Sequence, residues 1–140
     1  MASTAQRAEA WAYAQLVAGL AGAGIGTPPR IYAGRPPQHA QYPCCVYAVV
    51  AATDNGALGP QRMPSRVVLS ARGVAATEAP EDLDALVAAI DASLQTPPWT
   101  PPTGAVLCCQ REDELVYLGD SAGVAVWHRG ARYGLTTTPG

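Results

Sequence analysis

The sequence predicts an α+β domain: one mixed or antiparallel β-sheet with two main helices packed on it and a long loop between the central strands. Two segments, 3–20 and 80–94, have the apolar spacing of helices, and each precedes segments with strand patterns. Helices that alternate with blocks of strands are typical of α+β proteins. With 140 residues, 49% of them apolar and 14% charged, residues 1–140 suit a single domain with its own core.

The first helix is predicted over residues 3–20. Four apolar side chains define its expected buried face: Tyr13, Leu16, Val17 and Leu20. Trp11 lies nearly opposite Tyr13 on the helical wheel. We therefore expect Trp11 either to pack against another element or to lie at a subunit contact.

A segment rich in glycine and proline, residues 19–29, ends this helix. Its glycines superficially suggest a phosphate-binding loop. However, these glycines follow a helix and lead to prolines, whereas the dinucleotide-binding fingerprint follows a strand. The Walker loop is excluded as well, because it requires a lysine and the sequence contains none. The segment is interpreted as a helix stop and a turn.

Two strands are predicted between residues 30 and 53. Residues 30–34 suit a short edge strand, because the prolines that follow cannot donate hydrogen bonds to a ladder. Residues 44–53 are apolar at both alternating sets of positions, which is typical of a central strand covered on both faces. Tyr42-Pro43 favours an extended backbone at the start of this strand.

Residues 54–65 form a polar loop rich in glycine and proline. It is too long for a tight hairpin, and loops of about this length are often functional or mobile. The strand after it, 66–74, alternates, with Val67, Leu69 and Ala71 on one side and polar residues, two of them arginines, on the other. This pattern predicts a half-exposed strand.

The clearest helix covers residues 80–94. Pro80 suits its first turn, and the acidic residues near its start complement the positive end of the helix dipole, so we interpret them as capping rather than catalytic. Its predicted buried stripe consists of Leu83, Leu86, Val87, Ile90 and Leu94. The Pro-rich run 95–104 is interpreted as a stiff connector rather than as a ligand for a proline-binding domain.

Three strand-like runs complete the chain. They are residues 105–111, residues 115–120 with a turn at 119–121, and residues 122–137. We expect Arg129-Gly130 to mark a bulge or a turn that splits the last run in two.

Composition narrows the function classes. All nine basic residues are arginine, which a GC-rich genome explains and which also suits fixed interface contacts. The net charge of −2 provides no basic footprint for tight nucleic-acid binding. No apolar run approaches the roughly 20 residues that span a bilayer, and the first residues do not have the pattern of a secretory signal. We therefore expect a cytosolic protein at synthesis, with no membrane partner.

The four cysteines form two adjacent pairs, Cys44-Cys45 and Cys108-Cys109. Disulfides are not expected in a cytosolic chain. Neighbouring residues of a strand point to opposite faces, so neither pair can chelate a metal as C-x-x-C does. The cysteines are interpreted as small buried hydrophobes.

The two histidines, His39 in a loop and His128 in a strand, are the candidates for an alternative function as metal ligands or catalytic residues. With one cysteine of each pair they would form a zinc site. No G-x-S-x-G motif and no metal-type histidine pair is present, so we expect no catalytic residue, no cofactor and no metal, and we interpret His128 as structural.

Taken in order, these segments resemble the tail-terminator proteins of long-tailed bacteriophages, and the phage lambda terminator is similar in architecture. The resemblance rests on "RIYAGRPPQHAQYPCCVYAVV" (30–50), the alternating strand 66–74, the helix 80–94 and the closing "VAVWHRGARYGL" (124–135). It covers nearly the whole chain and depends on the order of the segments rather than on a signature. The cysteine pairs are not part of that pattern.

The resemblance implies a virion structural protein that is not an enzyme. It implies a homo-hexameric ring that caps the tail tube, ends its polymerisation and joins it to the head-completion proteins of the neck. DNA would pass through the lumen without specific binding. The protein would occur in the virion and, during assembly, in the host cytoplasm.

Interface residues are expected where polar segments and arginines reach the surface. The candidates are Trp11, Arg30, Tyr32, Arg35, Asp54, Asn55, Arg62, Arg66, Arg72, Arg129 and Arg132. We expect the loop 54–65 to become ordered when it docks on the tube. Two alternatives remain: a head-completion or connector adaptor of the neck, and a small metal-binding or enzymatic domain that uses the histidines and cysteines.

Overall fold

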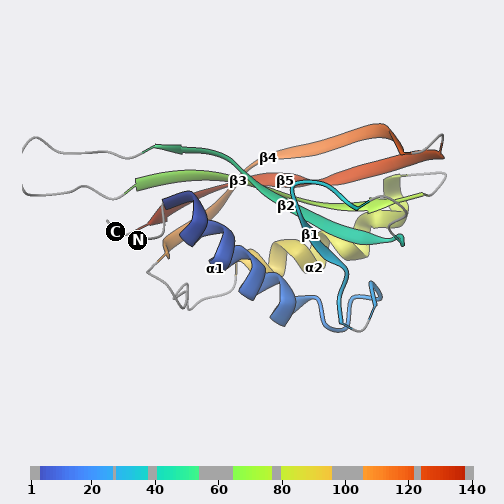
Figure 1. The fold of residues 1–140 in the computed structure, drawn as a ribbon, viewed down its shortest axis with the longest axis horizontal. Coiled ribbons are helices and arrows are strands. Elements are labelled where there is room, and N and C mark those ends of the chain that lie inside the picture. Colours follow the sequence, from blue (N-terminus) through green and yellow to red (C-terminus); the bar gives the residue numbers. More distant parts are fainter. Residues whose placement is uncertain are drawn as a thin grey trace, which may run out of the picture.

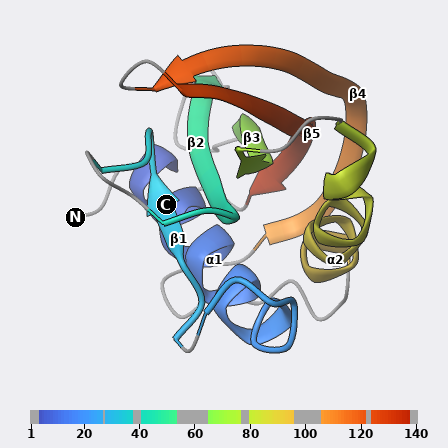
Figure 2. The same cartoon turned by 90° about the vertical axis from the view of Figure 1, so that its right-hand side faces the viewer.

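The computed structural model describes residues 4–26, 28–37, 41–53, 65–76, 80–95, 106–121 and 124–137. In chain order the elements are α1 (Thr4–Gly19), β1 (Ile31–Ala33), β2 (Cys44–Thr53), β3 (Ser65–Ala75), the 3-10 helix η1 (Pro80–Leu83), α2 (Asp84–Gln95), β4 (Val106–Ser121) and β5 (Val124–Thr137). Both α-helices lie on one face of a single curved sheet (Figures 1 and 2). The predicted α+β class is confirmed. Among the described residues, no helix is long and apolar enough to cross a membrane.

The sheet has five strands in the order β1-β2-β3-β5-β4. β1 pairs with β2 in parallel, and the other three pairs are antiparallel, so the sheet is mixed. β1 and β4 are the two edge strands, and the predicted edge position of residues 30–34 is confirmed. The predicted loop between β2 and β3 lies outside the described residues, apart from Ser65, which begins β3.

β2 is covered on both faces only in its first half. Cys45 and Tyr47 belong to the core under the helices, whereas Cys44 and Val46 belong to a smaller cluster on the other face. Further along, Val50 is 57% exposed. The prediction of a strand covered throughout was therefore wrong for its second half. There, no described strand pairs with β2 beyond Tyr47 on the β1 side, and a bulge lies between Val49 and Ala51.

The last three predicted runs form two long strands, not three or four. β4 runs through the acidic residues 112–114 with a bulge between Arg111 and Asp113, and Ser121 pairs with Val124 across the turn. β5 is continuous through Arg129-Gly130, so the expected split was wrong. A Cβ at Gly130 would lie 2.5 Å from the Cα of Arg72. This glycine allows two strands to approach closely and does not mark a turn.

The buried side of α1 differs from the predicted one. Tyr13 and Val17 are 49% and 37% exposed, whereas Trp11 is 1% exposed. The buried residues of this helix are Ala8, Trp11, Ala12 and Leu16. The alanines let the helix approach the sheet while the indole fills the core, so Trp11 packs within its own chain and its assignment to an interface was wrong.

α2 confirms the predicted stripe in its main residues. Leu83 in η1 and Leu86, Ile90 and Leu94 in α2 are buried in the core under the sheet. A polar tie fixes this helix to β5, because the hydroxyl of Tyr133 donates to Asp91 Oδ1 at 3.0 Å. Tyr133 itself is 1% exposed.

Candidate functional site

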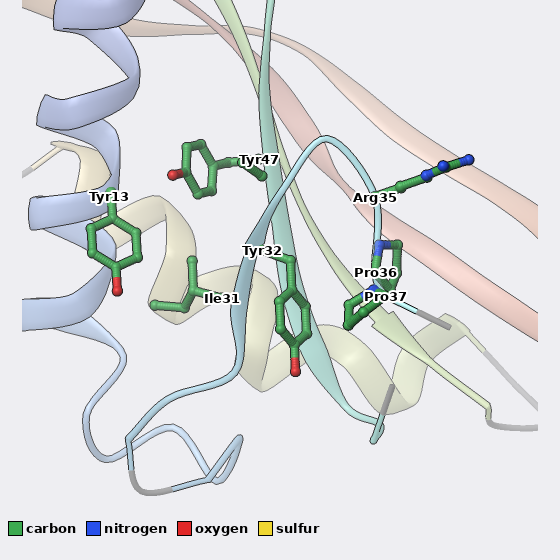
Figure 3. Close-up of a pocket in the computed structure, with 8 residues that line it drawn as sticks. Tyr13, Ile31, Tyr32, Arg35, Pro36, Pro37 and Tyr47 are labelled. Carbon is green, nitrogen blue, oxygen red and sulfur yellow. The ribbon is translucent and has the colours of Figure 1, made fainter. Parts of the chain in front are cut away.

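An open groove follows the free edge of β1. Its volume is about 850 Å³, and its walls come from α1, from both faces of β1, from the bend after it and from β2 (Figure 3). It is lined by Tyr13, Ile31, Tyr32, Ala33, Arg35, Pro36, Pro37 and Tyr47. We call this surface the β1-edge groove. The lining includes residues from both faces of β1. The groove therefore extends around the outer edge of β1, which pairs with no other strand among the described residues.

Local backbone chemistry shapes this groove. Gly34 has a φ of 80°, in the left-handed region that glycine adopts without strain. Its N–H donates to the carbonyl of Tyr47 at 2.8 Å, which ends the β1–β2 ladder. Pro36 and Pro37 then supply no donors. The chain therefore turns away from β2 and leaves the groove open.

Arg30 holds the other side of the Pro-rich bend. Its Nε and Nη2 atoms donate to the carbonyl of Pro43 at 3.1 and 3.0 Å. This forked contact joins the start of β1 to the start of β2, across the residues between them. Arg30 therefore stabilises the packing of β1 against the start of β2.

The helix-free face of the sheet carries ion pairs between strands. Arg132 in β5 donates to both carboxylate oxygens of Asp113 in β4, at 3.1 and 2.7 Å. Arg66 in β3 pairs with Glu112, the residue at the bulge of β4. Exposed pairs of this kind contribute about 0–1 kcal/mol each. They hold the edge strand in register but do not make a reactive site.

On the helix side, Arg129 connects the sheet to α2. It pairs with Asp84, the first residue of that helix, and more loosely with Glu114 of β4, where Nη2 and Oε1 are 3.5 Å apart. At the start of α2, Asp84 thus joins the helix to the sheet through an ion pair.

His128 belongs to a stacked polar cluster on the helix-free face. Arg72 Nε donates to His128 Nδ1 at 3.1 Å, and the imidazole stacks on Tyr117 with ring centroids 4.5 Å apart. Burial, with a smaller effect of the Arg72 guanidinium, lowers the pKa of His128 below its ordinary value. Since Nδ1 accepts a hydrogen bond, the imidazole is neutral here. The structural interpretation of His128 is confirmed by these contacts.

The described cysteines have the properties of core side chains. Cys44, Cys45 and Cys109 are buried thiols. Burial raises the pKa of the Cys44 thiol to about 11 and that of Cys45 to about 12, so both stay protonated at neutral pH. Within the described ranges, no three His, Cys, Asp or Glu residues are grouped to hold a metal. His39 and the side chain of Cys108 lie outside the described parts.

The predicted interface residues differ in their positions and contacts in the structure. Five arginines make contacts within the chain, and these are Arg30, Arg66, Arg72, Arg129 and Arg132. Tyr32 and Arg35 line the β1-edge groove. Asp54, Asn55 and Arg62 lie outside the described residues. Their role in an interface stays a prediction.

A second exposed surface lies on the opposite edge of the sheet. In β4, Val116 and Leu118 are 48% and 57% exposed, and Tyr117 between them is 43% exposed. Glu114 precedes them on the same strand face as Val116 and Leu118. We call Glu114, Val116 and Leu118 the β4-edge patch. In the sequence, this patch is visible only as the apolar run "LVYL" (115–118). The strand order is needed to show that the run lies at an edge of the sheet.

Comparisons with known proteins identify a shared fold. No family model matches the chain, and no curated protein matches its sequence significantly. A chain in the solved structure "Virion of native gene transfer agent (GTA) particle" is similar, with a TM-score of 0.67 and 13% identity. The match covers 97% of this chain and 100% of that one. At this identity the likeness shows the fold alone.

Proposed function

We propose that the protein is a structural component of a phage-like virion. The observation that carries this proposal is the match over both full lengths to a chain of a virion particle. Because both chains are covered almost completely, the likeness concerns a whole subunit and not a motif shared by unrelated domains. The sequence resemblance to tail terminators points to the same kind of particle.

The more specific role that we propose is that of a tail terminator. In this role the subunits form a ring, most simply a hexamer, on the last layer of the tail tube. The ring ends polymerisation and presents its other side to a head-completion protein. A net charge of −2 suits a lumen that DNA passes without being held.

The use of the polar side chains supports a structural role. The described arginines of β3 and β5 bond to carboxylates of β4 and α2 or to His128. His128 donates to no described nucleophile and instead accepts from Arg72. These groups stabilise a rigid block, which is what a ring subunit requires.

Particles assembled in the absence of the protein test this role. A tail terminator predicts tails of uncontrolled length that do not join heads, and restoration of both properties when the protein is supplied. Electron micrographs give the two readouts, tail length and the fraction of tails attached to heads. Tails of normal length that fail to attach would instead indicate the head-completion role. Normal, joined particles would contradict a structural role in the virion.

A further inference from the structure

The two edges of the sheet expose apolar side chains that lie on the same face. At the β4 edge, Val116 pairs with Arg129 and Leu118 with Trp127. Directly opposed residues of antiparallel strands point to one side, and Arg129 and Trp127 both contact the helix layer. Val116 and Leu118 therefore lie on the helix-bearing face.

The other edge has its exposed side chains on that face as well. Tyr13 of α1 is 49% exposed and stands 6.3 Å from the ring of Tyr47, centroid to centroid. Tyr47 and Ile31 contact the core under the helices, so this wall of the β1-edge groove belongs to the helix-bearing face. Figure 3 shows the rings of Tyr13 and Tyr47 beside the edge strand β1.

Each edge carries an exposed charged residue, and the two charges, those of Arg35 and Glu114, have opposite signs. Arg35 is exposed at the end of the β1-edge groove, and its guanidinium has no acidic partner among the described residues. In Figure 3 its side chain extends from the bend after β1, on the side of that strand away from Tyr13 and Tyr47. At the other edge, Glu114 is held only loosely, because Arg129 has its closer partner in Asp84. A change of partner for Glu114 therefore costs little.

Long apolar sheet edges promote pairing with another chain. β4 contains 16 residues and has no proline; its bulge and charges protect the part around residues 111–114 but not residues 115–118. Among the described residues, β2 has no pairing strand on its outer side from Ala48 to Thr53, beyond the end of β1. One molecule thus carries two unpaired edges that differ from each other in shape and charge.

We propose that β4 of a second copy docks along the β1–β2 edge, in head-to-tail continuation of the sheet. In this arrangement Val116 and Leu118 pack against Tyr13 in the β1-edge groove, and the opposite charges of Glu114 and Arg35 favour the encounter of the two edges. Main-chain pairing between edge strands supplies affinity, and the side chains supply specificity. An interface between two different surfaces repeats from copy to copy and closes into a ring where the rotation permits. The inference rests on the proposed ring-forming function and specifies its subunit contact.

Two single substitutions test this contact. Tyr13→Arg alters only the groove, and Leu118→Arg alters only the β4 edge; each places a charge where apolar contact is expected. Both positions are about half exposed, so the monomer should keep its melting temperature. Ala88→Arg, on the exposed side of α2, is the matched control. Self-association is measured by analytical ultracentrifugation over a concentration series.

The expected result is at least about tenfold weaker self-association for each of the two variants and no change for the control. A mixture of Tyr13→Arg and Leu118→Arg retains one intact groove and one intact edge. The mixture should form pairs that grow no further. In each pair the unoccupied groove carries the arginine at position 13, and the unoccupied β4 edge carries the arginine at position 118. Likewise, Arg35→Glu and Glu114→Arg should each weaken association, and together they should restore part of it.

The inference is overturned if either single variant assembles as the unaltered protein does, or if the mixture stays monomeric. The first result would indicate a two-fold contact through one edge alone. Assembly of both variants into rings, together with uncontrolled tails in particles lacking the protein, would refute this contact and leave the tail-terminator role intact. A protein that stays monomeric at every concentration and is absent from particles would overturn both.

Discussion

Gly19→Ala should destabilise the protein although it replaces a helix glycine with the best helix former. A Cβ at position 19 would lie 2.6 Å from the Cβ of Ser93 and closer still to its hydroxyl. The hydroxyl can rotate, but the two Cβ atoms separate only if α1 and α2 move apart. Overpacking of this kind costs about 1–3 kcal/mol, and the gain in helix propensity offsets about 0.5–1 kcal/mol. We expect the free energy of unfolding to fall by about 1–2 kcal/mol.

Gly22→Ala is the matched control, because nothing lies within 4 Å of a Cβ there. The rescue variant is Ser93→Gly, which removes the opposing side chain. Urea unfolding of both single variants and the double variant then gives a coupling energy, for which we expect about 1–2 kcal/mol in favour of the double variant. If Gly19→Ala is as stable as the unaltered protein, or if Ser93→Gly gives no recovery, the close α1–α2 contact is refuted.

Three further outcomes follow from buried groups. Tyr133→Phe should lower the urea-derived free energy of unfolding by about 1–2 kcal/mol, because Asp91 loses a hydrogen bond. Because the folded state lowers the pKa of His128 from 6.5, stability should decline as the pH falls from 6.5 towards that lowered value; the urea midpoint of His128→Phe should lack this component. With pKa values raised to about 11 and about 12, Cys44 and Cys45 should react with an aromatic disulfide at pH 8 only after unfolding, as followed by absorbance.

The sequence predicted most of the fold because periodicity records burial directly. The stripe Leu83–Leu94 and the alternation of Val67, Leu69 and Ala71 matched the buried positions. In both cases one face meets the core and the other meets solvent, so the pattern has a single solution. The two helices and a single sheet, mixed or antiparallel, followed from such patterns, and the prolines after residues 30–34 indicated the edge strand.

The phase of α1 was less predictable. Its true buried side contains Ala8 and Ala12, whose small side chains carry little hydrophobic signal, while Tyr13 and Val17 carry much more. Trp11 fills the space that the alanines leave. When a helix packs closely on a sheet through alanines, a sequence pattern can therefore assign the wrong face to the core. For α1 the predicted buried face was rotated about the helix axis by about one residue position.

The long β4–β5 hairpin was also not predictable from local pattern. Residues 112–114 are acidic and interrupt an apolar run, which is typical of a turn. In the folded sheet Glu112 and Asp113 face Arg66 and Arg132 on other strands. Such cross-strand pairs depend on the register of strands far apart in sequence, and a sequence pattern does not encode that register locally.

The candidate surfaces were predictable only in part. Tyr32 and Arg35 were expected at an interface, and both line the β1-edge groove. The exposed residues of β4 were missed, since an apolar run alone indicates burial as readily as an open edge. Strand order decides between these, and it places "LVYL" at the margin of the sheet.

Cryo-electron microscopy of purified particles is the measurement that separates a virion ring from every other role. Our proposal predicts a closed ring of this fold between the last layer of the tail tube and the neck. Within it, β4 of each copy should lie along the β1–β2 edge of the next. Particles whose tail–head junction holds no copy of this fold would contradict the proposal.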